Sequence, residues 1–430
     1  MDPLGPAHEL DAGRLRRLQL AGIASGFTAG AWLGAAEAPT KMVTLGLSPV
    51  VISLAMVMGV FLARWSLPAL LRGTSAIRAD VRQAPHLILW AVLAGCLWAV
   101  ANTLTIFAIR DIGLSIAFPL WNANSLLGIV WGALFFNELH GAGWRRRLGV
   151  LGGAAVMFAG ATLLAVASSA SAPSGHAARG VAAALAAGAL WGTMYIPYRK
   201  AYLTGMNPLA FITFFTVGEV IMMVALALAD RGGVAALATE LAGARDVLFW
   251  LLLGGFVWVV GDLFQQYAAK YVGISRGIPL SNTNQLWGLV WGLLVFGELR
   301  GGAATTYGQV IGGSLLMALG AVAIALASAT GAEHRRWQEA AEREGARYGI
   351  DPTYVRAALA GESSGESPTR RTWLDWLLVG IATATFIGFG MVARVPQLTL
   401  HWGWVAGLTA AMLALLFGTG WLLWRTTRFN

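Results

Sequence analysis

Charged residues are scarce in this chain of 430 residues, and so are cysteine and histidine. Asp, Glu, Lys and Arg make up 12% of the sequence, whereas hydrophobic residues make up 57%. A soluble domain carries about a quarter of charged residues, so this composition excludes an ordinary soluble fold. The single Cys96 excludes disulfides, and with six isolated histidines it completes no structural zinc site. We therefore predict no cofactor and no metal.

Catalytic and nucleotide-binding motifs are missing as well. The sequence contains no Walker-type phosphate loop, no nucleophile elbow and no zincin motif. An ATP-driven pump is therefore not supported, and we expect the protein not to be an enzyme. An intramembrane enzyme remains the alternative from a different class, and it would gather its polar groups at one membrane interface.

Long apolar runs dominate what is present. Each is long enough to cross a hydrocarbon core of ~30 Å as a helix. They cover residues 19–38, 44–63, 86–109, 114–137, 148–168, 180–198, 208–229, 247–269, 274–297, 305–328, 373–393 and 402–424. The sequence thus predicts an all-α polytopic membrane protein.

The net charge of +9 is distributed unevenly along the chain. If the N-terminus is cytoplasmic, most basic residues fall in loops on that same side. The residues assigned there include Arg16, Arg64, Arg72, Arg146, Arg199, Lys200, Lys270, Arg276, Arg335 and Arg425. The positive-inside rule explains this bias, so no nucleic-acid partner is needed. We expect the protein to lie in the inner membrane, with both termini in the cytoplasm. We also expect the first apolar segment to be retained as a transmembrane helix and not cleaved as a signal peptide.

An internal repeat links the two halves of the chain. Residues 113–141 ("GLSIAFPLWNANSLLGIVWGALFFNELHG") and 273–301 ("GISRGIPLSNTNQLWGLVWGLLVFGELRG") agree at 16 of 29 positions, too many for chance. The correspondence extends upstream and gives a unit of five spans. Because five is odd, the second copy must enter the membrane from the opposite face. Two inverted five-helix repeats are typical of secondary transporters.

The repeat sets the expected organisation. A cytoplasmic tail at 1–18 precedes the first repeat at 19–168, a linker at 169–179 and the second repeat at 180–328. A cytoplasmic polar helical insert follows at 329–372, then two additional transmembrane helices at 373–424 and a tail at 425–430. The two extra spans carry no polar pathway residues, so we expect them outside the ten-helix core, as a candidate homo-oligomer contact.

The motifs resemble a known group of transporters. The "FFNEL" and "VFGEL" ends, the Gly-rich segments after them and the five-plus-five arrangement resemble the drug/metabolite transporter superfamily. "GLSIAFPLWNANSLLGIVWG" and "LWGTMYIPYRKAYLTGMNP" are most similar to its glucose/ribose-type sugar uptake transporters, with rhamnose–proton symporters and ureide permeases as relatives. The resemblance covers about residues 18–328. It implies sugar transport, but the segments after residue 330 depart from that pattern.

Amides follow a proline in both copies. Pro119 and Pro279 interrupt their spans, and freed backbone at membrane depth is tolerated where it lines a wet cavity or is buried in protein. Amides both donate and accept hydrogen bonds, which suits an uncharged polyhydroxylated solute. The candidate solute-binding residues are Asn122, Asn124, Asn282, Asn284, Gln285, Trp121, Trp131, Trp287, Trp291, Asn102 and Gln265. Alternatively, the amides only join helices, and the tryptophans only pack or anchor.

Three acids lie inside apolar spans, where ionisable groups usually mark function. Glu219 and Asp262 are deep in the seventh and eighth spans, and Glu37 lies near the end of the first. Asp262 corresponds to the neutral Asn102 of the first copy, which makes it the favoured proton carrier, with Glu219 as the second choice. The alternative is a structural contact, such as a pair with Lys270 on the same helix. Glu138 and Glu298 are expected at helix ends.

The polar stretch 331–371 is too short for a core of its own. Asp351 and Pro352 form an N-cap and N1 pair that predicts a second short helix there. The segment is either a basic linker on the anionic inner leaflet or a docking or regulatory element.

These patterns together predict a secondary active transporter that moves a small neutral polar solute, most favourably a monosaccharide, by alternating access. Membrane lipid surrounds it, and a proton or another ion drives it. The alternative is an exporter of amphipathic metabolites or drugs, which would need a wide aromatic cavity without paired amides. A sensor that uses 331–371 as its output is a third class.

The topology can be tested by cysteine labelling. In a background without Cys96, cysteines at Ser174 and Gly302 should react with an impermeant thiol reagent added outside, because both loops are expected to face outward. Labelling of either position only from the inside would overturn the inverted arrangement.

Overall fold

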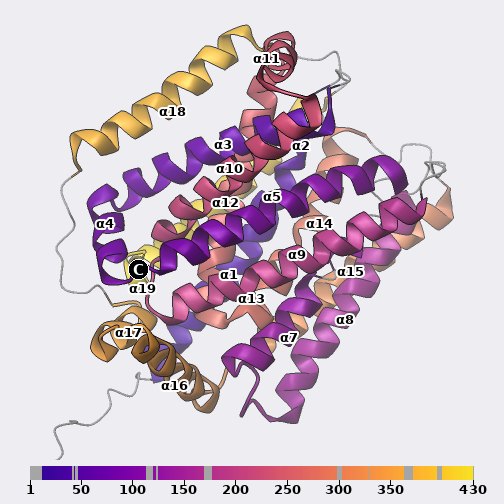
Figure 1. Cartoon of the computed structure of the whole chain (residues 1–430). Helices are drawn as coiled ribbons and strands as arrows, with labels where there is room; N and C mark the ends of the chain where they lie inside the picture. The colour runs from indigo at the N-terminus through magenta and orange to yellow at the C-terminus, as the bar shows by residue number, and fades with distance from the viewer. Residues whose placement is uncertain are drawn as a thin grey trace, which may run out of the picture.

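The computed structural model describes residues 12–40, 43, 47–112, 120–122, 124–168, 177–297, 303–327, 329–362, 371–394 and 400–429. Within these ranges the secondary structure is helical, with no strand. The helices are α1 (Ala12–Ala35), α2 (Glu37–Thr40), α3 (Pro49–Leu71), α4 (Thr74–Gln83), α5 (Leu87–Ile112), α7 (Asn124–Phe136), α8 (Gly143–Ser168), α9 (Ala177–Leu203), α10 (Pro208–Arg231), α11 (Val234–Gly243), α12 (Leu248–Val272), α13 (Ile274–Ser281), α14 (Asn284–Val290), the π-helix η1 (Trp291–Val295), α15 (Ala304–Leu326), α16 (Gly331–Arg347), α17 (Pro352–Leu359), α18 (Trp373–Val392) and α19 (Trp402–Thr427) (Figure 1).

The prediction of an all-α polytopic membrane protein is confirmed. Eight described helices are long and apolar enough to cross a membrane, namely α3, α5, α9, α10, α12, α15, α18 and α19. The four other expected spans fall on α1, on α7, on α8 and on the run α13–α14–η1. The first part of the fourth expected span, including Pro119, lies outside the described residues.

The helices begin and break where the sequence allows few other conformations. Ser48 and Asn207 cap α3 and α10, because their side chains accept hydrogen bonds from the amides of Val51 (3.3 Å) and Leu209 (2.8 Å). A proline follows each cap at the first helical position. The ninth expected span breaks, as predicted, but the break falls at Asn282 and Thr283, one turn after Pro279.

The long helices pack in pairs across the two halves of the chain (Figure 1). From the first half, α1 and α3 lie against α12. From the second half, α9 and α10 lie against α5 in the same manner, and α8 packs along α15. The sequence repeat matches α1, α3 and α5 with α9, α10 and α12. Each half therefore packs its first two long helices against the third long helix of the other half.

Glycines allow the closest of these approaches. Added side-chain carbons at Gly59 and Gly255 would collide with the carbonyls of Leu252 and Met56, so α3 and α12 touch backbone to backbone. Gly95 and Gly218 do the same where α5 crosses α10. Small residues at crossings compensate for the absence of a hydrophobic drive between helices in lipid.

The two C-terminal helices lie at the periphery. α18 packs against α3 and α12 on the outside of the bundle, and α19 packs against α1 (Figure 1). Only 11% of the apolar window of α18 and 17% of that of α19 are buried, so both present most of their surface to lipid.

The polar insert is not a linker lying loosely on the membrane. Asp351 caps α17 as predicted, with its carboxylate accepting from the Thr353 amide at 2.8 Å. α16, however, buries Trp337 and Ala341 in the largest hydrophobic cluster of the protein. A 17-residue helix can be held here because its apolar face completes the transmembrane core.

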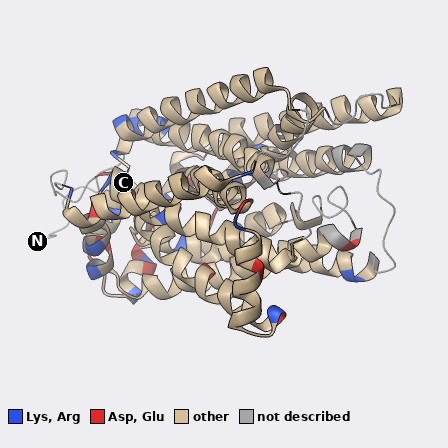
Figure 2. Ribbon diagram, turned by 90° about the horizontal axis from the view of Figure 1, so that it is seen from above, with Lys and Arg blue, Asp and Glu red and all other residues tan. Residues whose placement is uncertain are grey.

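Basic residues gather at one end of the bundle, which we call the basic end. Figure 2 shows Lys and Arg concentrated on the side where the C-terminus lies. α16 and α17 are at this end, and α11 is at the opposite end (Figure 1). The start of α1 also lies there, since Arg14 donates to the Ala360 carbonyl that follows α17 (3.0 Å).

The glycine crossings can be tested by adding volume. Gly95→Val should lower the thermal stability, because the new side chain would have to push α5 away from α10; overpacking typically costs about 1–3 kcal/mol. Gly380→Val on α18 is the matched control, since no atom lies near the position of its added carbon. Equal melting temperatures for the two variants in detergent would contradict the crossing.

Candidate functional site

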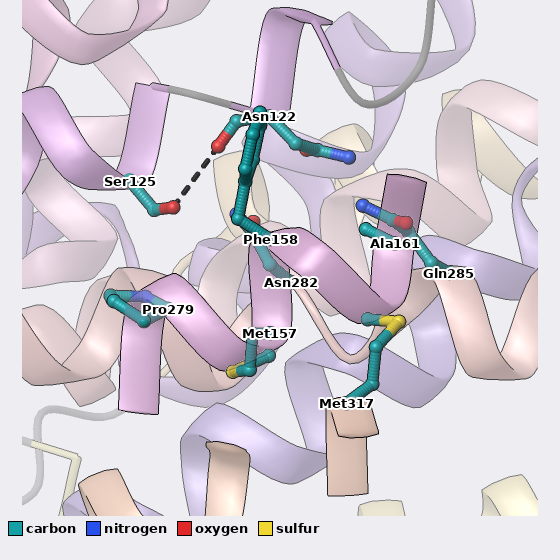
Figure 3. Close-up of a pocket in the computed structure, with 10 residues that line it drawn as sticks. Asn122, Ser125, Met157, Phe158, Ala161, Pro279, Asn282, Gln285 and Met317 are labelled. Atoms are coloured by element: carbon teal, nitrogen blue, oxygen red, sulfur yellow. Dashed lines mark hydrogen bonds between the residues drawn. The ribbon is translucent and has the colours of Figure 1, made fainter. Parts of the chain in front are cut away.

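A narrow cavity joins the two amide-bearing segments (Figure 3). Asn122 and Ser125 from the first half face Pro279, Asn282 and Gln285 from the second. The remaining wall comes from α8 and α15 and is apolar, with Ala154, Met157, Phe158, Ala161 and Met317. Its volume is about 10 Å³, enough for about one water molecule. This conformation is therefore closed around the amides.

Several buried amide atoms next to the break have no partner. The Nδ2 atom of Asn122 and the Oδ1 atoms of Asn124 and Asn284 make no hydrogen bond within the described part of the chain. Asn122 and Asn124 are 6% and 5% exposed, so bulk water does not satisfy them. Buried amide groups are costly when unpaired. Of these three residues, Asn122 lines the cavity, whereas Asn124 and Asn284 lie outside its lining.

The other candidate solute-binding residues lie outside the lining of this cavity. Asn102 donates to the Ser53 hydroxyl at 3.0 Å and Gln265 to the Ser281 hydroxyl at 2.6 Å, so both amides join helices here. Trp121 is buried edge-on against Trp191. Trp131 stacks on Phe135. Trp287 and Trp291 pack in the cluster around α1.

Three charged side chains meet in the centre of the bundle, and we call them the acid–arginine triad. Arg64 of α3 donates to Glu219 of α10 at 2.8 Å and to Asp262 of α12 at 2.6 Å. All three residues are 0% exposed. The guanidinium also stacks between the rings of Phe215 and Trp258, at 4.2 and 5.3 Å from the ring centres. Charge-assisted bonds and cation–π contacts both favour the ionised arginine.

The triad corrects two sequence interpretations. Arg64 was assigned to a cytoplasmic loop, but it lies inside α3, where the two acids compensate its charge. The structural alternative for Asp262 was an interhelical hydrogen bond or a pair with Lys270, and the carboxylate instead bonds Arg64 of another helix and Gln266, the latter at 2.8 Å. The side chain of Glu37 and the whole of Glu298 lie outside what the structure describes.

A second charge network closes the basic end. Glu138 is not at an exposed helix end but fully buried, and it pairs with Arg199 of α9 at 2.7 Å. Its carboxylate also accepts the amides of Ile274 and Ser275 at the start of α13 (3.1 and 2.8 Å). Arg199 donates in addition to the carbonyls at the end of α12. Glu138 thus ties the first half to the second.

α16 joins this network. The Thr330 side chain caps the helix and places Glu333 in its first turn. Glu333 forms two hydrogen bonds with Arg276 (2.7 and 2.9 Å) and accepts the Leu139 amide at 2.9 Å. Trp337 lies under the Arg199 guanidinium, 4.6 Å from its ring centre. α16 therefore bridges both halves where the pathway would open.

His334 stays neutral beside these charges. Burial is the main reason, and the nearby Arg199 adds to it, so the pKa of His334 falls to about 4. A neutral ring avoids a third cation next to Arg199 and Arg276 at physiological pH.

Arg199 and Arg276 were both counted as loop cations in the sequence analysis, and both are buried. One signal could have identified them: Arg199 and Arg276 each lie within or directly beside an apolar run. Their partners are far away in sequence, so only the folded chain reveals the pairs.

Comparisons with known proteins agree with this picture in part. Residues 233–348 match the model of a family described as "Sugar transport protein", which supports a sugar-transporter-type family. The matched region runs from α11 to the end of α16 and includes Asp262, Asn282 and Glu333. The match covers less than half of the chain, and the apolar helices show a multi-pass membrane protein.

No curated protein matches the chain. A solved structure titled "Crystal structure of protein" is similar at a TM-score of 0.46 and 16% sequence identity, over 69% of this chain and 96% of that chain. At this score the likeness assigns neither fold nor function.

The Glu333 contacts predict a local stability difference. Glu333→Gln should loosen α16, because removing one charge of a buried pair costs about 3–5 kcal/mol. Faster amide hydrogen exchange across α16 is the expected readout. Glu339→Gln, which changes an exposed glutamate of the same helix, is the control. Unchanged exchange in Glu333→Gln would show that the pair does not hold the helix.

Proposed function

We propose that this protein is a secondary active transporter of a small neutral polar solute, most favourably a monosaccharide. The carrying observation is the cavity in which Asn122 meets Asn282 and Gln285 from the opposite half of the chain. The unpaired Nδ2 atom of Asn122 offers a donor there, and the amides of Asn282 and Gln285 contain both donors and acceptors, as a sugar requires. The sugar-transport match over residues 233–348 supports the same solute class.

Transport then proceeds by alternating access between two inverted repeats. The exchange of helix partners between the halves, together with the glycine crossings, supports this arrangement. The cavity is too small for a sugar in the present conformation, so α8 and α15 must move away from the break for the solute to enter. We place the protein in an inner membrane, with the basic end facing the cytoplasm. The charge network at this end, formed by Glu138, Arg199, Arg276 and Glu333, closes it in the present conformation.

The coupling ion is a proton in this proposal. Glu219 and Asp262 lie in the bundle centre with no exposed surface, where an acid can change charge only when the pathway opens to one side. Glu37 of α2 remains a further candidate for the same role. The C-terminal helices α18 and α19 are available for an oligomer contact, because most of their surface is exposed.

The cavity disfavours the exporter alternative. Phe158 is the one aromatic side chain of its lining, and three amides line it. An amphipathic drug would require a wider and more aromatic surface.

The solute-binding role predicts a binding defect. Asn122→Ala and Asn282→Ala should each weaken binding of the recognised monosaccharide about tenfold or more, because a lost hydrogen bond to a buried partner costs roughly 1–3 kcal/mol. The affinity is obtained from thermal-shift titrations with glucose, ribose and rhamnose.

Thr383→Ala is the matched control, since Thr383 lies on α18 and its hydroxyl bonds only its own helix, to the Val379 carbonyl. Wild-type affinity in both folded asparagine variants would refute the site. A drug-like cation that stabilises the protein where no sugar does would favour the exporter.

A further inference from the structure

The charges of the acid–arginine triad do not cancel if all three side chains are ionised. One arginine faces two carboxylic acids, and all three side chains are fully buried. If both acids were ionised, the enclosed site would carry one uncompensated negative charge, which is strongly unfavourable in a bilayer. One further positive charge, such as a proton, is therefore required.

The neighbouring elements do not provide that charge. α9 presents the uncharged hydroxyl groups of Tyr198 and Tyr202. Lys270 lies two turns further along α12, and its ammonium group faces the Tyr271 ring at 5.7 Å. Among the described basic residues, Arg64 is the one that pairs with these carboxylates.

Hydrogen bonds favour the ionised form of Asp262. Its Oδ2 atom accepts from Arg64 and its Oδ1 atom from the Gln266 amide, at 2.6 and 2.8 Å. Gln266 in turn accepts the Tyr202 hydroxyl. All these donors point toward Asp262, so both of its oxygens are satisfied as a carboxylate.

Glu219 has a different environment. Its Oε2 atom accepts from Arg64 at 2.8 Å, but its Oε1 atom is buried and makes no hydrogen bond. The buried Thr216 hydroxyl, three residues earlier on the same helical face, lies beside the Glu219 carboxyl without a well-aligned hydrogen bond, and a hydroxyl can accept as well as donate one. A proton on Oε1 would remove the excess charge and turn this oxygen into a donor.

We propose that the triad is a one-proton site in which Glu219 carries the proton, while Arg64 and Asp262 form the ion pair. The positive charge of Arg64 balances one of the two carboxylates, so one proton is needed to neutralise the other. Glu219 releases H⁺ from Oε1 to water when the pathway opens to one side and regains it from the other side. This rests on the proposed transport function and specifies its coupling: one proton for each solute. It also favours Glu219 over Asp262 as the proton carrier.

The protonated carboxyl can be observed without any solute. In infrared difference spectra at neutral pH, the wild-type protein should show the C=O stretch of one buried protonated carboxyl, and Glu219→Gln should lose it. Asp262→Asn should lose it too, because Glu219 then becomes the sole counter-ion of Arg64 and ionises. Glu339→Gln should leave it unchanged.

Arg64→Gln provides the opposite change. Without the cation both acids should be protonated, so the band should double. If that variant does not fold, the Glu219→Gln and Asp262→Asn pair decides, since each retains a balanced charge. A wild-type protein without the band, or Asp262→Asn with the full band, would overturn the one-proton site. A band that appears only after sodium is removed would show a sodium ion in place of the proton.

Transport measurements test whether the one-proton site couples sugar transport to protons, separately from whether the site exists. In proteoliposomes, Glu219→Gln and Asp262→Asn should exchange the sugar down its gradient but fail to accumulate it under an imposed pH gradient. The wild-type protein should move one proton per sugar. A confirmed band without pH-driven accumulation would retain the one-proton site and refute the coupling.

Discussion

A charge buried inside a bilayer must be balanced by groups of the protein a few ångströms away, because no solvent is there to do so. This constraint shapes the protein at two levels. In the centre, Arg64 draws Glu219 and Asp262 together from three helices. At the basic end, Glu138 and Glu333 pair with Arg199 and Arg276. The pairs of Arg64 and of Arg199 join the two halves of the chain, and the Glu333–Arg276 pair ties α16 to the second half, so the charges fix how these parts pack on each other.

The two levels differ in what they allow. At the basic end, two acids face two arginines and accept three backbone amides, so the charges of that network cancel, although the Nη2 atom of Arg199 makes no hydrogen bond within the described residues. In the proposed transporter, such an arrangement would hold the basic end shut. The central triad has one acid too many, and a buried excess of this kind can be relieved by an exchangeable proton. Under the proposed function, the same kind of contact would therefore close the protein at the basic end and bind a proton in the centre.

Local features were readable from the sequence, while pairings between helices were not. The apolar runs predicted the helices, and Asp351 with Pro352 predicted the start of α17. Asn122, Asn282 and Gln285, which the sequence singled out by their place after a proline in each copy, line one cavity, and their role in binding a solute stays a prediction. Arg64, in contrast, was misplaced because it directly follows the apolar run 44–63, whereas α3 continues beyond it to Leu71. Its partners are 155 and 198 residues away, so only helix packing brings them together.

The repeat aligns Asn102 with Asp262, and the two residues have different partners. Both residues contact α3, but Asn102 meets the neutral Ser53 and Asp262 meets Arg64. The glycine crossings and the exchange of helix partners give the two halves similar contacts, which supports a rocking motion about the break. A charged pair in both copies would place two titratable sites in one pathway and require two ions for each cycle. The Asn102 contact lies within the first half, whereas the Asp262 contact joins the two halves, so the buried charge is confined to one of the two corresponding positions and the proposed cycle needs a single ion.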